Sequence, residues 1–201
     1  MFVTFEGLDG CGKTTQAVLL ADALRGDGVE VVSTREPGGT PLGEAIRDLV
    51  LHGGHVAPWA EAALYAASRA QHVDGVIRPA LERGATVVCD RYIDSSVAYQ
   101  GVGRVLDPEA VRSLSEWATE GLAPDLTILL DLDADAARGR LDEARTRYDR
   151  LEAEASEFHD RVRAAYLALA EAEPDRFLVV DAARPVDEIA GDIRGRVAHL
   201  L

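Results

Sequence analysis

The stretch "FVTFEGLDGCGKTT" (2–15) runs from an apolar, β-branched segment into a glycine-rich loop. Its second part, "GLDGCGKTT" (7–15), fits the pattern G-x-x-x-x-G-K-[ST] of a phosphate-binding loop. The loop follows a predicted strand at 2–6 and precedes a predicted helix at about 14–26, the context that this pattern requires. A glycine-rich turn before an ordinary helix is the alternative. The complete pattern in this context favours phosphate binding.

Each part of this loop has a predicted role toward a nucleotide. The glycines let backbone N–H groups wrap around a phosphate, and the following helix N-terminus adds donors and a positive dipole end. Lys13 is predicted to reach the β- and γ-phosphates of ATP, and Thr14 to be a Mg²⁺ ligand. We expect Cys11 to fill space rather than to be a reactive thiol. The predicted nucleotide-binding residues are Gly7, Leu8, Asp9, Gly10, Cys11, Gly12, Lys13, Thr14 and Thr15.

Apolar, β-branched runs alternate with amphipathic helical segments along the rest of the chain. The predicted strands are "FVTFE" (2–6), "VEVVST" (29–34), "ATVVCD" (85–90), "LTILLDL" (126–132) and "RFLVVDA" (176–182). The predicted helices span about 14–26, 41–51, 59–82, 108–119, 134–143, 155–172 and 186–200. Continuous apolar strands are typical of parallel sheets that are buried on both faces. We therefore expect an α/β fold, a five-stranded parallel sheet with helices on both faces, in one domain (1–201).

The composition excludes several kinds of partner. With 35 acidic and 21 basic residues the net charge is −14, so the basic surface that binds nucleic acid or an anionic membrane is missing. No window approaches the roughly 18 apolar residues of a membrane helix. Two cysteines cannot build a disulfide framework, and "MFVTFEGLDG" (1–10) is unlike a secretory signal. We expect a cytoplasmic protein.

A phosphate loop leaves three classes of function open: a small-molecule phosphotransferase, a GTPase-like switch, and an ATP-driven assembly factor. The N-K-x-D motif expected of a GTPase is absent from the sequence. An assembly factor needs further domains or a partner surface, for which 201 residues leave little room. A compact kinase fits best.

Polar residues after the second and third predicted strands mark the acceptor side. Ligands of open parallel sheets gather at the carboxyl ends of strands. Asp90 ends an apolar strand, where a carboxylate needs a partner or a metal. Arg91 is placed to take a phosphate bidentately, and Arg35 and Arg47 could contribute. Each arginine taken alone is typical of a surface ion pair, but three of them beside strand ends favour a phosphate site.

Three stretches closely resemble signatures of the thymidylate kinase family. They are "REPGGT" (35–40), "AASRAQHV" (66–73) and "DRYIDSSVAYQG" (90–101). The resemblance runs from the first strand to the C-terminal helix. It implies a P-loop nucleotide kinase fold and Mg²⁺-dependent transfer of the γ-phosphoryl group of ATP to dTMP, giving dTDP and ADP, in dTTP biosynthesis. It also implies a homodimer formed by helices, for which the alanine-rich segment 59–70 would allow close packing.

Residue by residue, the resemblance implies a complete acceptor site. Arg47 and Arg91 would hold the dTMP phosphate, and Asp9 would contact the sugar 3′-hydroxyl or a metal-bound water. Tyr65, where the family usually has phenylalanine, would stack on the base; its hydroxyl needs a partner or water. The implied substrate-binding residues are Asp9, Arg35, Glu36, Pro37, Arg47, Tyr65, Arg69, Arg91, Ser96, Tyr99 and Gln100, and the implied metal ligands are Thr14 and Asp90. Among these, Arg69 and Gln100 would read the base edge with Ser96 beside them, and Tyr99 would favour deoxyribose.

The charged run "EARTRYDRLE" (143–152) lies where compact nucleotide kinases carry a lid, here at about 142–154. The phosphate loop has no arginine at its variable positions, and R-x-R-x-x-D-R resembles the bacterial-type branch that keeps its arginines in the lid. Arg145, Arg150 and, more loosely, Arg147 are therefore predicted to be catalytic together with Lys13 and Arg91. Asp149 and Glu152 would hold the lid arginines while the lid is open.

Two alternatives remain beside a dTMP kinase. The first is a deoxynucleoside or other nucleotide kinase. A deoxynucleoside kinase would need a carboxylate such as Glu36 as a base, and it would not need the phosphate-binding pair Arg47 and Arg91. A non-catalytic ATP-binding module would bind ATP without acceptor-dependent release of ADP.

Overall fold

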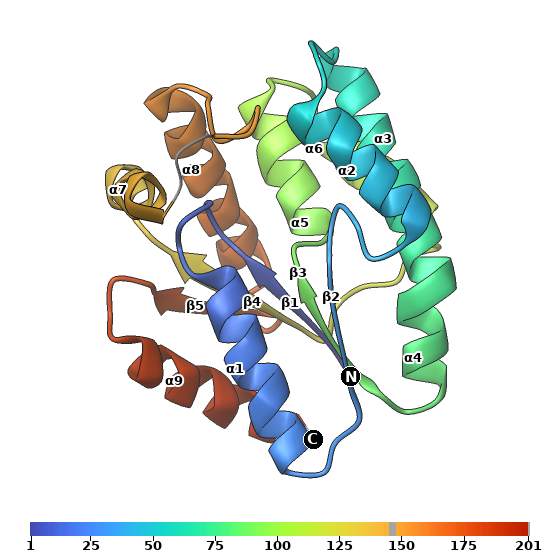
Figure 1. The fold of residues 1–201 in the computed structure, drawn as a ribbon, viewed down its shortest axis with the longest axis vertical. Coiled ribbons are helices and arrows are strands. Elements are labelled where there is room, and N and C mark those ends of the chain that lie inside the picture. Colours follow the sequence, from blue (N-terminus) through green and yellow to red (C-terminus); the bar gives the residue numbers. More distant parts are fainter. Residues whose placement is uncertain (145–147, 201) are drawn as a thin grey trace.

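A computed structural model describes residues 1–144 and 148–200. The predicted catalytic residues Arg145 and Arg147 lie outside the described residues. The fold is built on a five-stranded sheet in the order β2-β3-β1-β4-β5, in which every strand pairs in parallel with its neighbours (Figure 1). The strands are β1 (Phe2–Glu6), β2 (Val31–Arg35), β3 (Thr86–Asp90), β4 (Leu126–Asp131) and β5 (Phe177–Asp181). The predicted α/β fold with a five-stranded parallel sheet is confirmed.

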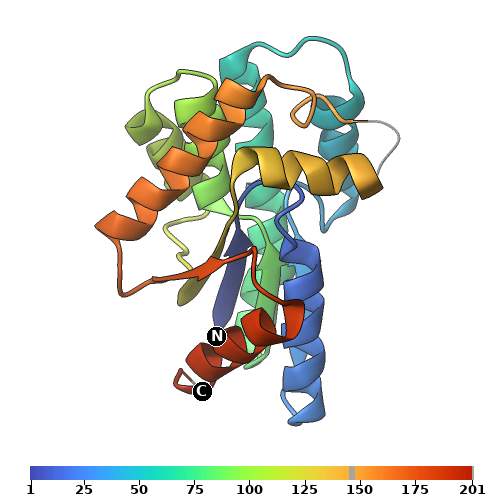
Figure 2. The same ribbon diagram turned by 90° about the vertical axis from the view of Figure 1, so that its left-hand side faces the viewer.

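Helices cover both faces of this sheet. In the two views α1 and α9 lie together on one face, and α8 lies on the other (Figures 1 and 2). The helices are α1 (Lys13–Gly26), α2 (Pro41–His52), α3 (Pro58–His72), α4 (Arg78–Glu82), α5 (Ile93–Ser96), α6 (Pro108–Ala118), α7 (Ala134–Ala144), α8 (Ser156–Ala172) and α9 (Val186–Ala198), with π-helical segments η1 (Val73–Ile77) and η2 (Val97–Gly103). None of the helices in the described part of the chain is long and apolar enough to cross a membrane.

The strands are not all buried, contrary to the expectation from their apolar sequences. The central strand β1 is buried at every residue, whereas β2 has Ser33 and Arg35 exposed and β5 has Val179 exposed. These two strands form the edges of the sheet, so each has a neighbouring strand on one side only. An apolar run therefore predicted the strand but not its place in the sheet.

Two helical regions also differ from the prediction. The expected single helix at 59–82 is divided by the π-helical segment η1, which contains Gly75 and precedes Pro79 in α4. Glycine weakens a helix, and proline lacks the amide that would continue the ladder. The sequence analysis predicted no helix at 93–103, where the structure has α5 and η2. Several of the predicted substrate-binding residues lie in this segment.

Candidate active site

The phosphate loop connects β1 to α1 at the carboxyl end of the sheet. Gly7 and Gly12 both have positive φ angles, 135° and 98°. A Cβ on Gly7 would lie 2.5 Å from the carbonyl oxygen of Leu130, so the loop backbone can pass β4 only without a side chain here. Gly12 caps α1 without a side-chain hydrogen bond. The first amide groups of α1 have no intrahelical partners and remain available to an anion.

Lys13 and Thr14 begin the helix that follows this loop. The Lys13 ammonium group donates hydrogen bonds to the carbonyl oxygens of Gly7 (3.1 Å) and Leu8 (2.8 Å), which folds the side chain over the loop. The Thr14 hydroxyl donates to Oδ2 of Asp90 at 2.7 Å. The two predicted metal ligands are thus neighbours, and both line the cavity over the phosphate loop. Two hard oxygen donors beside a phosphate site fit Mg²⁺, which uses few protein ligands and completes its shell with water and phosphate.

Two cavities meet above the carboxyl ends of β1 and β3. The first, the phosphate cavity, is lined by Gly10 and Gly12 of the loop, by the first residues of α1 and by side chains from β2, β3 and α7. The second, the acceptor cavity, is lined by side chains from α2, α3, η2 and the segment after α7. Both cavities are lined by Asp9, Glu36, Arg47 and Arg91. A group held by these shared residues can be reached from either side.

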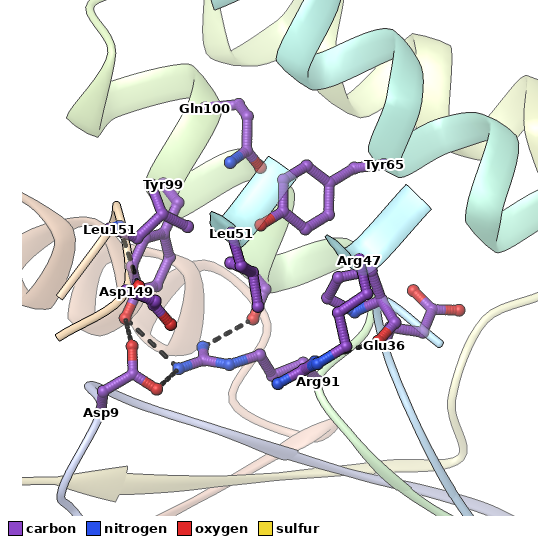
Figure 3. Close-up of a pocket in the computed structure, with 12 residues that line it drawn as sticks. Asp9, Glu36, Arg47, Leu51, Tyr65, Arg91, Tyr99, Gln100, Asp149 and Leu151 are labelled. Carbon is purple, nitrogen blue, oxygen red and sulfur yellow. Dashed lines mark hydrogen bonds and ion pairs between the residues drawn. The ribbon is translucent and has the colours of Figure 1, made fainter. Parts of the chain in front are cut away.

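Arg91 occupies the junction of the two cavities. It follows β3 with a φ of 72°, an uncommon conformation for a residue with a side chain. Its guanidinium group donates to Oδ1 of Asp9 at 2.6 Å, to the carbonyl oxygen of Gly7 at 3.2 Å and to Oγ of Ser95 at 3.1 Å. It also lies 5.0 Å from the centre of the Tyr99 ring. The guanidinium is therefore fixed between the phosphate loop and the acceptor cavity (Figure 3).

Asp9 and Arg91 each stabilise the charged form of the other. Burial of Asp9 opposes its ionisation, but Arg91 and then Lys13 outweigh burial and hold the pKa of Asp9 well below its usual value. Burial likewise opposes the cationic form of Arg91, while Asp9 and Tyr99 raise its pKa well above the ordinary value. Both groups are charged throughout the neutral pH range. The junction thus holds a cation that a phosphate could bind in place of Asp9.

The upper part of the acceptor cavity is aromatic and amide-lined. Tyr65 on α3 is buried, and its ring and hydroxyl lie against the cavity (Figure 3). Burial raises the pKa of Tyr65, so its hydroxyl stays protonated at neutral pH. Gln100 lies beside this ring in Figure 3, and Tyr99 donates from its hydroxyl to Oδ2 of Asp9 at 3.3 Å. A flat heterocycle would fit against Tyr65 with its edge toward Gln100.

A family model described as thymidylate kinase matches residues 5–193, which is most of the chain. This chain belongs to the thymidylate kinase family. It is thus a phosphotransferase of the nucleoside monophosphate kinase class, as the sequence resemblance predicted. The other functions that the sequence left open, a deoxynucleoside kinase and a non-catalytic ATP-binding module, are not favoured.

Individual relatives are similar over nearly their whole length. The thymidylate kinase of Leifsonia xyli subsp. xyli is 70% identical over 198 residues, which cover 98% of this chain and 94% of the relative. The thymidylate kinase of Clavibacter michiganensis subsp. michiganensis is 64% identical over 202 residues, with 100% and 96% coverage. The crystal structure of thymidylate kinase from Ehrlichia chaffeensis superposes with a TM-score of 0.80 at 34% identity and covers 98% of both chains.

Two residues expected from thymidylate kinases to face the base are used elsewhere in this structure. Arg69 is 1% exposed and donates to Oε2 of Glu36 (2.7 Å) and to Oγ of Ser115 (3.0 Å). It also donates to Oγ of Ser96 at 3.0 Å. Neither Arg69 nor Ser96 lines the acceptor cavity, whereas Ser95 does. The reason is electrostatic: a buried Glu36 needs a cation, and Arg69 supplies it.

The turn after β2 positions the predicted phosphate-binding arginines. Glu36 and Pro37 line the acceptor cavity, and Arg47 donates to the carbonyl oxygen of Pro37 at 3.0 Å. Arg35 lines the phosphate cavity but not the acceptor cavity, and it donates to the carboxylate of Glu44 at 2.9 and 3.0 Å. Arg47 and Arg91 are thus brought together at the junction, and Arg35 stands on the phosphate side.

Arg150 is docked rather than extended toward the phosphate cavity. Its Nε atom donates to the carbonyl oxygen of Val50 at 2.8 Å, and its guanidinium forms an ion pair with Glu61. Neither Asp149 nor Glu152 holds Arg150 in this structure, contrary to the expectation, and the same expectation for Arg145 and Arg147 lies outside the described residues. Asp149 instead accepts the backbone amides that follow it, and Glu152 accepts the amide of Asp149. A buried carboxylate on α3 attracts Arg150 more strongly than the carboxylates of its own turn.

Glu6 is a site residue that the sequence analysis missed. It is fully buried at the end of β1, where its Oε2 atom accepts from Ser95 Oγ (2.6 Å) and from the Tyr166 hydroxyl (2.8 Å). Both of these groups also accept from Arg91. Burial and the nearby Asp94 raise the pKa of Glu6 to about 7. A carboxylate that ends an apolar strand, the argument applied to Asp90, would have identified it.

Two further side chains lie in or near the phosphate loop and its cavity. Arg140 on α7 lines it and donates to the carbonyl oxygen of Ala182 at 3.0 Å. Its place in the charged stretch before the lid gave no separate signal in the sequence. Cys11 is buried, and burial raises the pKa of its thiol. The surroundings of Cys11 therefore support the space-filling role and not the reactive thiol.

Proposed function

We propose that this kinase transfers the γ-phosphoryl group of ATP to dTMP, giving dTDP and ADP. The observation that carries the proposal is the meeting of a phosphate cavity and an acceptor cavity at Arg91 and Arg47. An acceptor that already bears a phosphate needs cations at this place, and a nucleoside does not. Membership of the thymidylate kinase family supplies the identity of the acceptor.

The phosphate loop holds the donor in this proposal. Backbone amides at the start of α1 surround the β-phosphate, and Lys13 turns from the carbonyls of Gly7 and Leu8 to the β- and γ-phosphates. Thr14 and Asp90, which are neighbours in the structure, would hold Mg²⁺. The ion would supply positive charge that neutralises the phosphates. Arg140 adds a cation from the α7 side of the same cavity.

The acceptor cavity holds dTMP with its phosphate at Arg91 and Arg47. The base lies on Tyr65 with its edge toward Gln100, and Tyr99 stands where a ribose 2′-hydroxyl would have to fit. Asp9, which now accepts from Arg91, is close enough to the junction to receive the sugar 3′-hydroxyl. These assignments are the ones that the family resemblance implies, and the residues concerned all line the acceptor cavity.

The chemistry consists mainly of positioning and charge stabilisation. A phosphate monoester is nucleophilic at neutral pH, so no side chain has to remove a proton from the acceptor. The main obstacle is the repulsion between two polyanions, which Lys13, Arg47 and Arg91 reduce. Phosphoryl transfer spreads negative charge over the equatorial oxygens, and cations fixed in advance stabilise that charge without reorganisation.

Arg150 supplies a further cation when the lid closes. We propose one domain, residues 1–201, with a lid at about 142–154. In the described structure Arg150 is paired with Glu61, so closure over ATP exchanges this ion pair for contact with the transferring phosphoryl group. The roles of Arg145 and Arg147 in the same lid remain predictions.

The activity is tested by offering ATP and Mg²⁺ with dTMP, dUMP, dCMP or thymidine and following the release of ADP. We expect dTMP to be phosphorylated in strong preference to thymidine, with dTDP as the product by mass spectrometry. Equal turnover of thymidine would contradict the proposal. ATP binding without acceptor-dependent ADP release would show a binding module instead.

We also infer a homodimer that pairs through α2 and α3 in the cytoplasm. Leu42 and Leu49 on α2 and Trp59 on α3 are 49%, 57% and 49% exposed. Exposed alanines on α3, at 60, 63 and 67, let a second helix approach closely. Light scattering is expected to give twice 21.6 kDa, and Leu49→Arg to give the monomer mass. A wild-type monomer would contradict the inference.

The free, buried thiols of Cys11 and Cys89 suit a reducing compartment.

A further inference from the structure

Glu61 is a buried carboxylate that the proposed chemistry does not use. It lies on α3 with no exposed surface and is one of the deepest charged residues in the described structure. Its Oε1 atom accepts from Nε2 of Gln100 at 2.9 Å and from Nε of Arg104 at 3.4 Å. Its Oε2 atom is paired with Arg150. A carboxylate buried at such cost needs partners, and one of these partners is a residue of the acceptor cavity.

The contact between Glu61 and Gln100 fixes the direction of an amide group. A carboxylate only accepts hydrogen bonds, whereas an amide has a donor side and an acceptor side. The NH₂ group of Gln100 must therefore face Glu61. Its carbonyl oxygen is left on the other side, toward the acceptor cavity and Tyr65 (Figure 3). Within the described residues this oxygen has no hydrogen-bond partner, although Gln100 is only 2% exposed.

Arg104 favours the ionised, accepting form of Glu61. It contacts the same oxygen as Gln100 and is itself paired with Glu154, and Arg150 is paired with the other oxygen in the described structure. Beside Arg104, an ionised Glu61 offers Gln100 only hydrogen-bond acceptors. Gln100 cannot turn its amide over without placing a carbonyl oxygen against a carboxylate, which is repulsive in a buried site. The acceptor cavity therefore presents a fixed hydrogen-bond acceptor.

We propose that Glu61 is a positioning residue that makes the acceptor site select bases with a hydrogen on N3. Resting on the proposed function, the inference names the edge of the base that is read. Thymine and uracil carry a hydrogen on N3 and can donate to the carbonyl oxygen of Gln100. The N3 atom of cytosine is an acceptor, so it would face another acceptor. A site with a buried, oriented polar group rejects a ligand that leaves this group unpaired.

The test compares dUMP with dCMP as acceptors, because both lack the 5-methyl group and differ only at N3 and C4. The measured quantity is the ratio of kcat/KM for dUMP to kcat/KM for dCMP in the wild type and in Glu61→Gln. A glutamine at this position can offer either a donor or an acceptor, so Gln100 becomes free to turn. We expect the ratio to fall by about tenfold or more.

The matched control is Glu154→Gln, which makes the same chemical change in the same charged cluster without touching Gln100. We expect the dUMP to dCMP ratio of this variant to equal that of the wild type. An unchanged ratio in a folded Glu61→Gln protein, or an equal fall in both variants, would overturn the inference. Activity of the wild type toward dTMP is measured in parallel. Its absence would instead contradict the proposed function.

The wild-type protein offers a measurement that does not depend on the folding of a variant. In ¹⁵N-labelled protein the side-chain NH₂ protons of Gln100 can be assigned by their loss in Gln100→Leu or by through-space contacts to α3. A hydrogen bond to Glu61 predicts slow exchange of one of these protons with solvent, before and after dTMP is added. Rapid exchange, or a through-space contact from the NH₂ group to the bound base, would overturn the inference.

Discussion

The guanidinium group of Arg91 lies 2.6 Å from the carboxylate of Asp9, so a residue after the third strand closes onto the phosphate loop. This ion pair spans the boundary between the two cavities. It keeps a cation in place before any substrate arrives, which is the arrangement that favours electrostatic catalysis. A phosphate entering the acceptor cavity has to compete with Asp9 for Arg91, and that exchange is central to the proposed function.

Replacing Arg91 should therefore reduce activity without unfolding the protein. Arg91→Lys keeps the charge but loses the two-pronged donor geometry, and we expect kcat/KM for dTMP to fall by about 100-fold or more. Steady-state kinetics with ATP in excess provides the measurement. The control is Arg194→Lys, because within the described residues Arg194 forms an exposed ion pair with Asp27 alone, at the end of α1 opposite to the phosphate loop. Full activity in Arg91→Lys would contradict the role of Arg91.

The lid arginine should act on turnover more than on binding. We expect Arg150→Ala to lower kcat by about 100-fold, because it removes a cation from the transferring phosphoryl group. The dissociation constant of dTMP, measured by calorimetry, should change much less. An unchanged kcat would mean that Arg150 has no catalytic role and only stabilises the structure through its contacts with Glu61 and Val50. A large rise in the dissociation constant at constant kcat would indicate that Arg150 only shapes the acceptor cavity.

Glu6 should give the stability of the protein a characteristic dependence on pH. Its ordinary pKa is 4.5, and in the folded protein burial and Asp94 raise it to about 7. Between these values the unfolded chain has released the proton and the folded protein has kept it. The free energy of unfolding therefore falls as the pH rises from 4.5 to about 7, by at most about 1.4 kcal/mol per pH unit, and this contribution is constant above that range.

Urea unfolding at several pH values measures the unfolding free energy of the wild type and of Glu6→Gln. The glutamine resembles the protonated side chain of Glu6 and does not titrate. The difference in unfolding free energy between the wild type and Glu6→Gln should change across the range from 4.5 to 7 and be constant above it. If the unfolding free energies of the two proteins differed by the same amount at every pH from 4.5 to 7, the pKa of Glu6 in the folded protein would not be raised. That outcome would also remove the reason for placing Glu6 in the network that supports Arg91.

Arg69 should matter more to stability than to recognition of the base. Arg69→Met leaves Glu36 buried without its strongest partner, and breaking a buried ion pair of this kind costs about 3–5 kcal/mol. Urea unfolding measures the loss, and calorimetry under folding conditions measures the affinity for dTMP and dCMP. A large loss of base selectivity with little loss of stability would instead support the role that the family resemblance implies for Arg69.

The sequence predicted those parts of the site that follow from local patterns. The phosphate loop and the alternation of strands and helices could be read from residues that are near one another in the chain. The rule that strand ends converge placed the stretch after the third strand beside the phosphate loop, where Asp90 contacts Thr14. For these features local sequence and topology are sufficient.

The remaining parts depend on contacts that no local pattern encodes. Glu61 and Gln100 are separated by 39 positions, and their contact requires α3 to lie beside the unpredicted segment η2. Arg150 reaches Glu61 across 89 positions. Whether a buried arginine faces a ligand or a protein carboxylate is decided by which partner lies within reach once the helices have packed. Tertiary packing therefore set the roles of these charged side chains.

The most direct test of the central claim is a crystal structure of the protein with dTMP and ADP. The account predicts that the dTMP phosphate is held by Arg91 and Arg47, that Arg91 has left Asp9 at least in part, and that the base lies on Tyr65 with N3 facing the carbonyl oxygen of Gln100. A dTMP phosphate bound away from Arg91, with the ion pair between Arg91 and Asp9 unchanged, would contradict it.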